Sequence, residues 1–180
     1  METTAHPTRI DGYAAALLDI ARAEGEPEEF TDEFFRAVRA LDANVELRDT
    51  LVDPLIPGER RQGIVDELLG PRADRVTVAA VNFVIAAGQG KHLEAISSRL
   101  VQLAAEQEGA VVAEVRSAVT LDQDQIRRLE EALSAASGRR VQVKAVTDPA
   151  VLGGIVTKIG DTVFDGSVKS RFDDLREQWG

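Results

Sequence analysis

Residues 110–119 read AVVAEVRSAV, and this stretch divides the chain into two parts of different character. It is rich in β-branched residues that partly alternate with others, which is typical of a strand. The sequence before Gly109 reads as a series of helices, whereas strands and helices are mixed after it. A run of helices followed by a compact α/β segment predicts the α+β class, with one domain at 1–108 and a second at 109–180.

Six helices are expected in the first domain, because apolar residues recur there at helical spacing and Gly or Pro residues interrupt the pattern. The third helix should begin after Asn44, whose side chain can cap a helix. The expected ranges are Arg9–Glu24, Glu28–Asp42, 45–51, Glu59–Leu69, Asp74–Ala87 and Lys91–Glu108. The sequence therefore predicts an N-terminal six-helix bundle.

A small α/β domain with a mixed sheet is expected after Gly109. The predicted elements are a strand at 110–119, a helix capped by Thr120 that runs to Ala136, strands at Arg140–Val146, Gly154–Ile159 and Thr162–Phe164, and a last helix. Gly160-Asp161 can join the last two strands as a hairpin. On the last helix, Val168, Phe172, Leu175 and Trp179 share one apolar side.

Composition and charge exclude several classes of protein. The chain has 180 residues, of which 31 are acidic and 21 basic, and this balance argues against a nucleic-acid binder, because phosphate contacts need a basic face. There is no Cys, which excludes disulfides, Cys-ligated zinc, iron–sulfur clusters and thiol catalysis. The charge is uneven: residues 1–108 hold 20 acidic and 11 basic residues (−9), and residues 109–180 hold 11 and 10 (−1). This asymmetry agrees with a division near Gly109.

Direct insertion into a membrane is not expected. A spanning helix needs about 20 consecutive apolar residues. The most apolar stretch, Val76–Ala87, is shorter and contains Thr77 and Asn82. The first residues, METTAHPTRIDG, lack a basic region followed by an apolar run, so no secretory signal is predicted. These features predict a cytoplasmic protein.

Neither a catalytic, a metal nor a cofactor site is expected from the motifs. His6 and His92 have no second His or carboxylate at metal-binding spacing, so we interpret both as surface residues. Acidic pairs are adjacent in the sequence, and neighbours on a helix diverge by about 100°. An enzyme with an unrecognised site remains an alternative, and it would need a pocket around Asp148, Lys158 and Asp161.

The segment Val76–Ala87 is apolar around nearly its whole circumference. Such a helix is either buried on all sides or leaves an apolar stripe for a partner. The first helix carries Ala14, Ala15 and Ala16, which permit the close approach of another helix. A groove between the two could accept an amphipathic helix of another chain. The residues alone favour core packing over such a groove.

The C-terminal part resembles a known family. It contains Thr147-Asp148-Pro149, Val151-Leu152-Gly153-Gly154-Ile155, Lys158-Ile159-Gly160-Asp161 and Asp165-Gly166-Ser167-Val168. With Tyr13-Ala14-x-Ala16-Leu17 near the N-terminus, these motifs resemble the delta subunit of F-type ATP synthases, a family that includes the oligomycin-sensitivity-conferring protein. Thr157 stands where the family usually has an aliphatic residue, but Thr is also suited to a strand.

The motif also has a structural interpretation. Asp148-Pro149 favours a turn, and glycines allow backbone angles or close approaches that a Cβ would prevent. Ser167 can cap the last helix. We interpret these residues as determinants of the fold rather than catalytic groups: Asp148, Gly153, Gly154, Gly160, Asp165, Gly166 and Ser167.

The resemblance implies a non-catalytic stator subunit at the cytoplasmic face of the cell membrane. The helical domain would hold the N-terminal helix of an alpha subunit in a groove made mainly by the first and fifth helices. The second domain would meet the C-terminal part of the b subunits. The expected contacts with the alpha-subunit helix are Tyr13, Ala14, Leu17, Val81, Val84 and Ile85. The alternative is a free-standing adaptor that binds another amphipathic helix.

Overall fold

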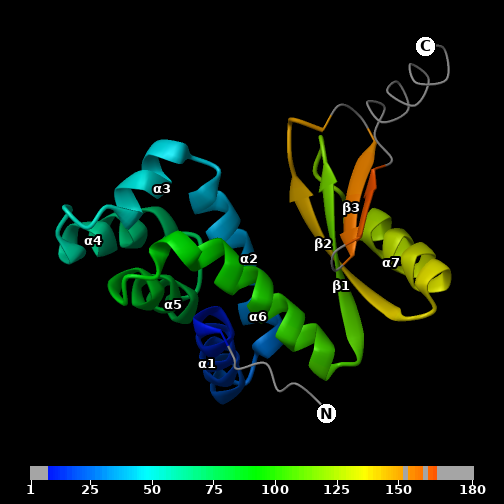
Figure 1. Cartoon of the computed structure of the whole chain (residues 1–180), viewed down its shortest axis with the longest axis horizontal. Coiled ribbons are helices and arrows are strands. Elements are labelled where there is room, and N and C mark those ends of the chain that lie inside the picture. Colours follow the sequence, from blue (N-terminus) through cyan, green and yellow to red (C-terminus); the bar gives the residue numbers. More distant parts are fainter. Residues whose placement is uncertain (1–7, 152–153, 160–161, 166–180) are drawn as a thin grey trace. The chain divides into compact units, whose positions relative to one another are not determined.

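A computed structural model describes residues 8–151, 154–159 and 162–165. The chain divides into two compact units, Met1–Ala104 and Ala105–Gly180, which are described separately below (Figure 1). The expected limit at residues 108 and 109 lies just after this division, at the end of the last helix of the first part.

The first unit is helical. Its elements are α1 (Arg9–Glu24), α2 (Pro27–Asp42), α3 (Val45–Val52), α4 (Gly58–Leu69), α5 (Arg75–Ala86), the short 3₁₀ helix η1 (Gly90–His92) and α6 (Leu93–Gln107). These bounds agree with the predicted ranges to within two residues. Asn44 caps α3, as predicted, by accepting a hydrogen bond from the Leu47 N–H at 3.0 Å.

Local chemistry accounts for the ends of α1. The Thr8 hydroxyl accepts from the Asp11 N–H, and the Asp11 carboxylate accepts from the Thr8 N–H, which together form a capping box. At the other end, Gly25 adopts φ +90°, a left-handed conformation that favours glycine. The sequence around each terminus therefore sets the length of this helix.

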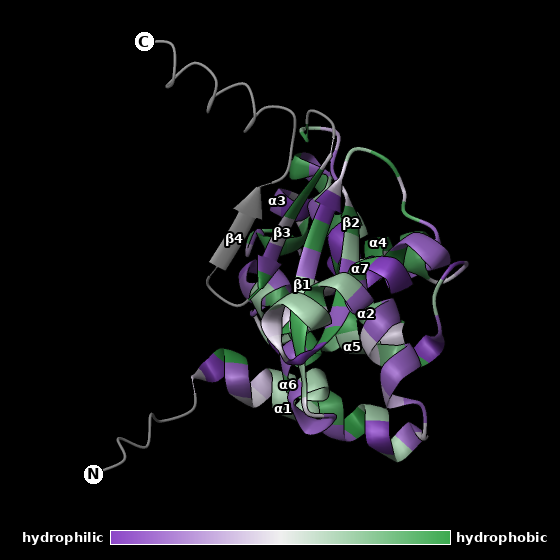
Figure 2. Ribbon diagram, turned by 90° about the vertical axis from the view of Figure 1, so that its right-hand side faces the viewer, coloured by the Kyte–Doolittle hydropathy of each residue, from purple (hydrophilic) through white to green (hydrophobic). Residues whose placement is uncertain are grey.

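The helices of the first unit share one apolar core. Its fully buried side chains come from elements far apart in the sequence, among them Leu17 on α1, Phe34 on α2, Val65 on α4, Val84 on α5 and Leu100 on α6. The helices in Figure 2 carry hydrophilic and hydrophobic segments in alternation, as amphipathic helices around a common core do. Burial of these apolar side chains is the main stabilising term of the unit.

The second unit holds a sheet and one described helix. Its elements are β1 (Ala110–Ser117), α7 (Gln123–Ser137), β2 (Arg140–Thr147), β3 (Ile155–Ile159) and β4 (Thr162–Asp165). The strand order is β2-β1-β3-β4; β1 and β2 are parallel, and the other neighbours are antiparallel. The predicted mixed sheet and the α+β class are confirmed. The predicted last helix, with Val168, Phe172, Leu175 and Trp179, lies outside the described residues.

The cap predicted for α7 is wrong. Asp122, not Thr120, is the N-cap: its carboxylate accepts from the Gln125 N–H at 2.8 Å, and the Gln125 side chain accepts from the Asp122 N–H at 2.9 Å. Leu121 and Ile126, on either side of this cap, both pack against the core of the unit, as in a hydrophobic staple. The reciprocal pair and the staple together favour the later start. The Thr120 hydroxyl instead lies 3.4 Å from the Thr147 hydroxyl.

A small core joins α7 to the sheet. Ala113 and Val115 of β1 and Val141 and Val143 of β2 are buried, and the apolar side of α7 packs against them through Ile126, Leu129 and Leu133. These strand residues alternate along the sequence, so they share one face of the sheet. This face and α7 form the two layers of the unit (Figure 1).

Candidate partner-binding site

The structure brings the six predicted contact residues together within the first unit, at different depths. Five of them are at most 1% exposed and belong to its apolar core: Ala14, Leu17, Val81, Val84 and Ile85. Tyr13 is half-buried and packs against the edge of the same core. Tyr13 is therefore the one predicted residue that presents appreciable surface to solvent.

Tyr13 meets a residue that the sequence did not single out. Its ring lies 5.9 Å from the ring of Phe83 on α5, with the two planes inclined at 47°. The Phe83 side is open to solvent, and this residue is 50% exposed. The pair joins α1 to α5 at the surface, directly where a groove between these helices was expected.

An apolar stripe extends from this pair along both helices. Ile20, two turns after Tyr13 on the same side of α1, is 41% exposed. On α5, Ala79 is exposed one turn before Phe83. The opposite side of α5 is buried. The helix that is apolar all around is thus neither wholly internal nor wholly exposed, and its outer side can bind another apolar surface.

Polar contacts hold α5 in place on α2. The Glu33 carboxylate accepts from the Thr77 hydroxyl at 2.6 Å and from the Asp74 N–H at 2.9 Å. Asp74 in turn caps α5 by accepting from the Val76 N–H at 2.8 Å. Thr77 is fully buried, so its hydroxyl needs this acceptor. Since α2 contacts both α1 and α5, it sets the spacing of the two helices that carry the stripe.

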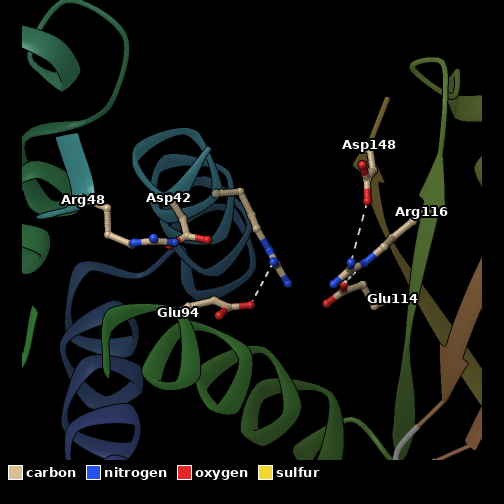
Figure 3. Close-up of polar contacts among 7 residues, drawn as sticks. Asp42, Arg48, Glu94, Glu114, Arg116 and Asp148 are labelled. Carbon is tan, nitrogen blue, oxygen red and sulfur yellow. Dashed lines mark hydrogen bonds and ion pairs between the residues drawn. The ribbon is translucent and has the colours of Figure 1, made fainter. Parts of the chain in front are cut away.

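A cavity of about 300 Å³ lies elsewhere in the first unit, between the end of α2, α3 and the turn that leads into α6. Its floor is apolar. Two ion pairs lie at its rim: Arg48 faces Asp42 at 3.4 Å, and Arg39 donates to Glu94 at 2.9 Å (Figure 3). Lys91 lines the same cavity, so its rim carries charges of both signs.

The motif residue Asp148 has a structural environment. Its N–H donates to the Ser117 carbonyl at 2.8 Å, which fastens the end of β2 to β1. Its carboxylate accepts from the Ala150 N–H at 2.9 Å and lies 3.7 Å from the Arg116 guanidinium, which also donates to Glu114 at 3.0 Å (Figure 3). Asp148 therefore begins a turn, as Asp148-Pro149 predicted.

The other motif residues are only partly visible. Gly154 has φ +74°, so its lack of a Cβ serves the backbone. Asp165 ends β4 and pairs with Val156. Gly153, Gly160, Gly166 and Ser167 lie outside the described residues, as do Asp161 of the alternative catalytic site and His6. Lys158 is exposed on β3.

Within the described ranges, no group of three or more His, Cys, Asp or Glu side chains could hold a metal ion. None of the helices in the described part of the chain is long and apolar enough to cross a membrane.

The comparison with known families decides the affiliation. A family model described as "ATP synthase delta (OSCP) subunit" matches residues 10–179. The chain belongs to this family. The resemblance seen in the motifs is thus confirmed over nearly the whole chain.

Two members of this delta/OSCP family are similar to the chain in amino-acid sequence over most of its length. "ATP synthase subunit delta" of Parafrankia sp. (strain EAN1pec) is 40% identical over 161 residues, which cover 89% of this chain and 58% of the relative. The protein of the same name from Salinispora arenicola is 38% identical over 162 residues, covering 90% and 59%. The chain thus spans less than two thirds of the length of these relatives.

A solved structure shows the same fold. A chain in the cryo-EM structure of the Toxoplasma gondii mitochondrial ATP synthase hexamer aligns with a TM-score of 0.58 and 19% identity, covering 96% of this chain and 97% of that one. The delta/OSCP fold therefore fits both units of this chain.

Proposed function

We propose that this protein is a non-catalytic stator subunit of an F-type ATP synthase. It links the catalytic head to the b subunits, so that proton-driven rotation is coupled to ATP synthesis and the head does not turn with the rotor. The family match over residues 10–179 is the observation that carries this proposal. In this role the protein is peripheral, at the cytoplasmic face of the cell membrane.

Residues 1–108 act in this proposal as one six-helix bundle that holds the N-terminal helix of an alpha subunit. The partner helix lies on the α1–α5 surface, where Tyr13 and Phe83 meet. Of the predicted contact residues, Tyr13 touches the partner directly. The other five, Ala14, Leu17, Val81, Val84 and Ile85, form the buried apolar layer beneath this surface.

The surface suits an amphipathic helix for two physical reasons. Phe83 and Ile20 offer exposed apolar area, and a partner helix that covers them removes it from water. Small residues beside them, such as Ala16 and Ala79, are exposed and leave room for close approach. The Tyr13 hydroxyl adds a hydrogen-bonding group at the margin. The excess negative charge of residues 1–108 favours a partner helix with basic residues and an association rate that falls with salt.

Residues 109–180 meet the C-terminal part of the b subunits in the same proposal. The support here is the family membership and the separate compact unit that begins at Ala105. The sheet, with α7 packed on it, gives a second attachment point that is separate from the helical domain.

Calorimetric titration with a peptide that copies about the first 20 residues of the cognate alpha subunit tests the alpha-subunit contact; such a length forms a helix of about 30 Å. The expected result is a saturable 1:1 isotherm that is lost in Phe83→Asp. The matched control is Leu55→Asp, since Leu55 is also an exposed apolar residue, 89% accessible, on the loop after α3. Equal binding by both variants would remove the α1–α5 surface from the proposal.

Co-purification separates the stator from a free-standing adaptor. The stator is expected to co-purify with membranes that carry the ATP synthase and to be released together with its catalytic head. An adaptor would bind amphipathic peptides without preference for the alpha-subunit sequence and would stay in the soluble fraction.

A further inference from the structure

The strand β2 stands at one end of the sheet, and within the described residues no strand pairs with its outer side. The Asp148 N–H, just past β2, donates inward to Ser117 of β1. Because backbone groups alternate along a strand, the even-numbered residues of β2 point at β1 and the odd-numbered ones point away. Outward N–H groups at a sheet edge invite pairing with another strand.

Two of these outward groups are occupied by side chains of α7. The Val141 N–H donates to the Ser134 hydroxyl at 3.0 Å, and the Val143 N–H donates to the Glu130 carboxylate at 2.9 Å. Both bonds are partly buried. Another strand could pair with this half of β2 only after it displaced the Ser134 hydroxyl and the Glu130 carboxylate from these N–H groups.

The two acceptors match the strand because of simple geometry. Residues four apart on a helix are separated by about 6.0 Å along its axis, and residues two apart on a strand by about 6.6 Å. Because α7 runs antiparallel to β2 and the two spacings nearly match, Glu130 lies beside Val143 and Ser134 lies beside Val141. The next step along α7 reaches Ile126, which has no acceptor to offer the Ala145 N–H. The hydrogen bonds from the edge of β2 to α7 thus end after Val143, because the next helix residue in line is apolar.

We propose that Glu130 and Ser134 guard the edge of β2 and keep a second copy of this chain from adding its own β2 to it. The occupant that the guard excludes is a second β2, because two identical edges can pair antiparallel about a two-fold axis with the same residues on both sides. The guard acts within the second unit and is independent of the stator role proposed above.

The test compares the double variant Glu130→Ala/Ser134→Ala with Glu131→Ala. Glu131 is the neighbouring carboxylate, exposed on α7, so its removal changes the charge equally and leaves the guard in place. Analytical ultracentrifugation should show wild type and Glu131→Ala as monomers, and the double variant as a concentration-dependent dimer. Alanine is favourable in a helix, so α7 itself is expected to persist, as circular dichroism would show.

Hydrogen exchange provides a measurement on the unmodified protein. The Val141 and Val143 amides should exchange at least about ten-fold more slowly than the Ala145 amide, because among the contacts of the described residues the first two amides have acceptors and the Ala145 amide has none. Equal exchange at the three amides would overturn the proposal. So would a folded double variant that stays monomeric although its Val141 and Val143 amides have become fast.

The conservative variant Glu130→Gln keeps an acceptor oxygen. Its comparison with Glu130→Ala tests the proposal if the double variant does not fold. Glu130→Gln should remain monomeric with a slow Val143 amide, whereas Glu130→Ala alone should dimerise detectably. Identical self-association of the two single variants would contradict the guard.

Discussion

The Asp11 carboxylate on α1 accepts a hydrogen bond from the Arg99 guanidinium on α6 at 2.8 Å, although 88 positions separate the two residues in the sequence. Its second oxygen accepts from the Thr8 hydroxyl at 2.7 Å and from the Thr8 N–H at 2.8 Å. The Thr8 hydroxyl, followed by Arg99 and the Thr8 N–H, lowers the pKa of Asp11 from 3.8 to about 2. One carboxylate thus caps α1 and ties it to the last helix of the first unit.

This arrangement predicts how stability depends on pH. Because the pKa of Asp11 is lower in the folded than in the unfolded chain, the ionised carboxylate stabilises the fold fully above pH 3.8, and this contribution is lost as the pH falls towards 2. Urea unfolding of wild type and Asp11→Asn should therefore give a difference in unfolding free energy that is present at pH 6 and shrinks below pH 4. Asp19→Asn, which removes an exposed pair with Arg22 on the same helix, is the control. A difference that stayed constant down to pH 2 would contradict the assignment.

Substitutions of Leu17 and Ile20 on α1 should separate effects on stability from effects on binding at the α1–α5 surface. Leu17 is fully buried in the core, so Leu17→Ala should lower the free energy of unfolding by about 2–5 kcal/mol. Ile20→Ala, on the same helix but 41% exposed, should change the free energy of unfolding by less than about 1 kcal/mol. It should instead lower the affinity for the alpha-subunit peptide. Chemical unfolding followed by circular dichroism measures the first effect, and calorimetry the second. Equal destabilisation by both changes would mean that Ile20 belongs to the core.

The hydrogen bonds that Glu33 accepts should contribute more to the stability of the fold than their position near the surface suggests. Glu33→Ala leaves the buried Thr77 hydroxyl without its acceptor, which costs about 1–3 kcal/mol. Glu29→Ala removes an exposed carboxylate one turn earlier on α2 and serves as the control. Thr77→Val in the Glu33→Ala background should restore part of the loss, since it removes the unsatisfied hydroxyl. No recovery in that double variant would show that the hydroxyl is not the source of the cost.

The start of α7 offers a comparison between two capping residues. Asp122→Ala removes the observed cap and should lower the free energy of unfolding by about 0.5–2 kcal/mol. Thr120→Ala removes the residue that the sequence favoured and should have a clearly smaller effect, because its hydroxyl does not bond to the helix terminus. Thermal unfolding of both variants provides the measurement. A larger effect at Thr120 would place the cap there after all.

Local sequence was sufficient for the helices of the first unit. Residues such as Thr8, Gly25 and Asn44 act on their own neighbours, through caps and left-handed turns whose chemistry is readable within a few positions. The choice between Thr120 and Asp122 was harder, because both can cap a helix. The reciprocal Gln125 contact and the packing of Leu121 favoured the second, and the packing depends on a core that the local pattern does not reveal.

The sequence could not show how deeply the side chains of the candidate site are buried. The sequence indicated α1 and α5 as the helices concerned and named Tyr13, but it also named five residues that lie in the core. Helix α5 is apolar on every side, so periodicity carries no information about which side faces out. Phe83 could not be distinguished from Val81, Val84 or Ile85 by pattern. Its exposure follows from the position of α2 behind the helix, which the Glu33 contacts establish.

By itself, the sequence determined the α+β class, the succession of helices and strands, and the membership of the delta/OSCP family, because caps, turns and motifs act over short distances. Only the tertiary structure decided that Phe83 joins Tyr13 at the surface, that Asp11 meets Arg99, and that Glu130 reaches the edge of β2. Each of these relationships depends on how one element packs on another. That packing arises from burial of a shared core, and burial is a property of the folded chain rather than of any single segment.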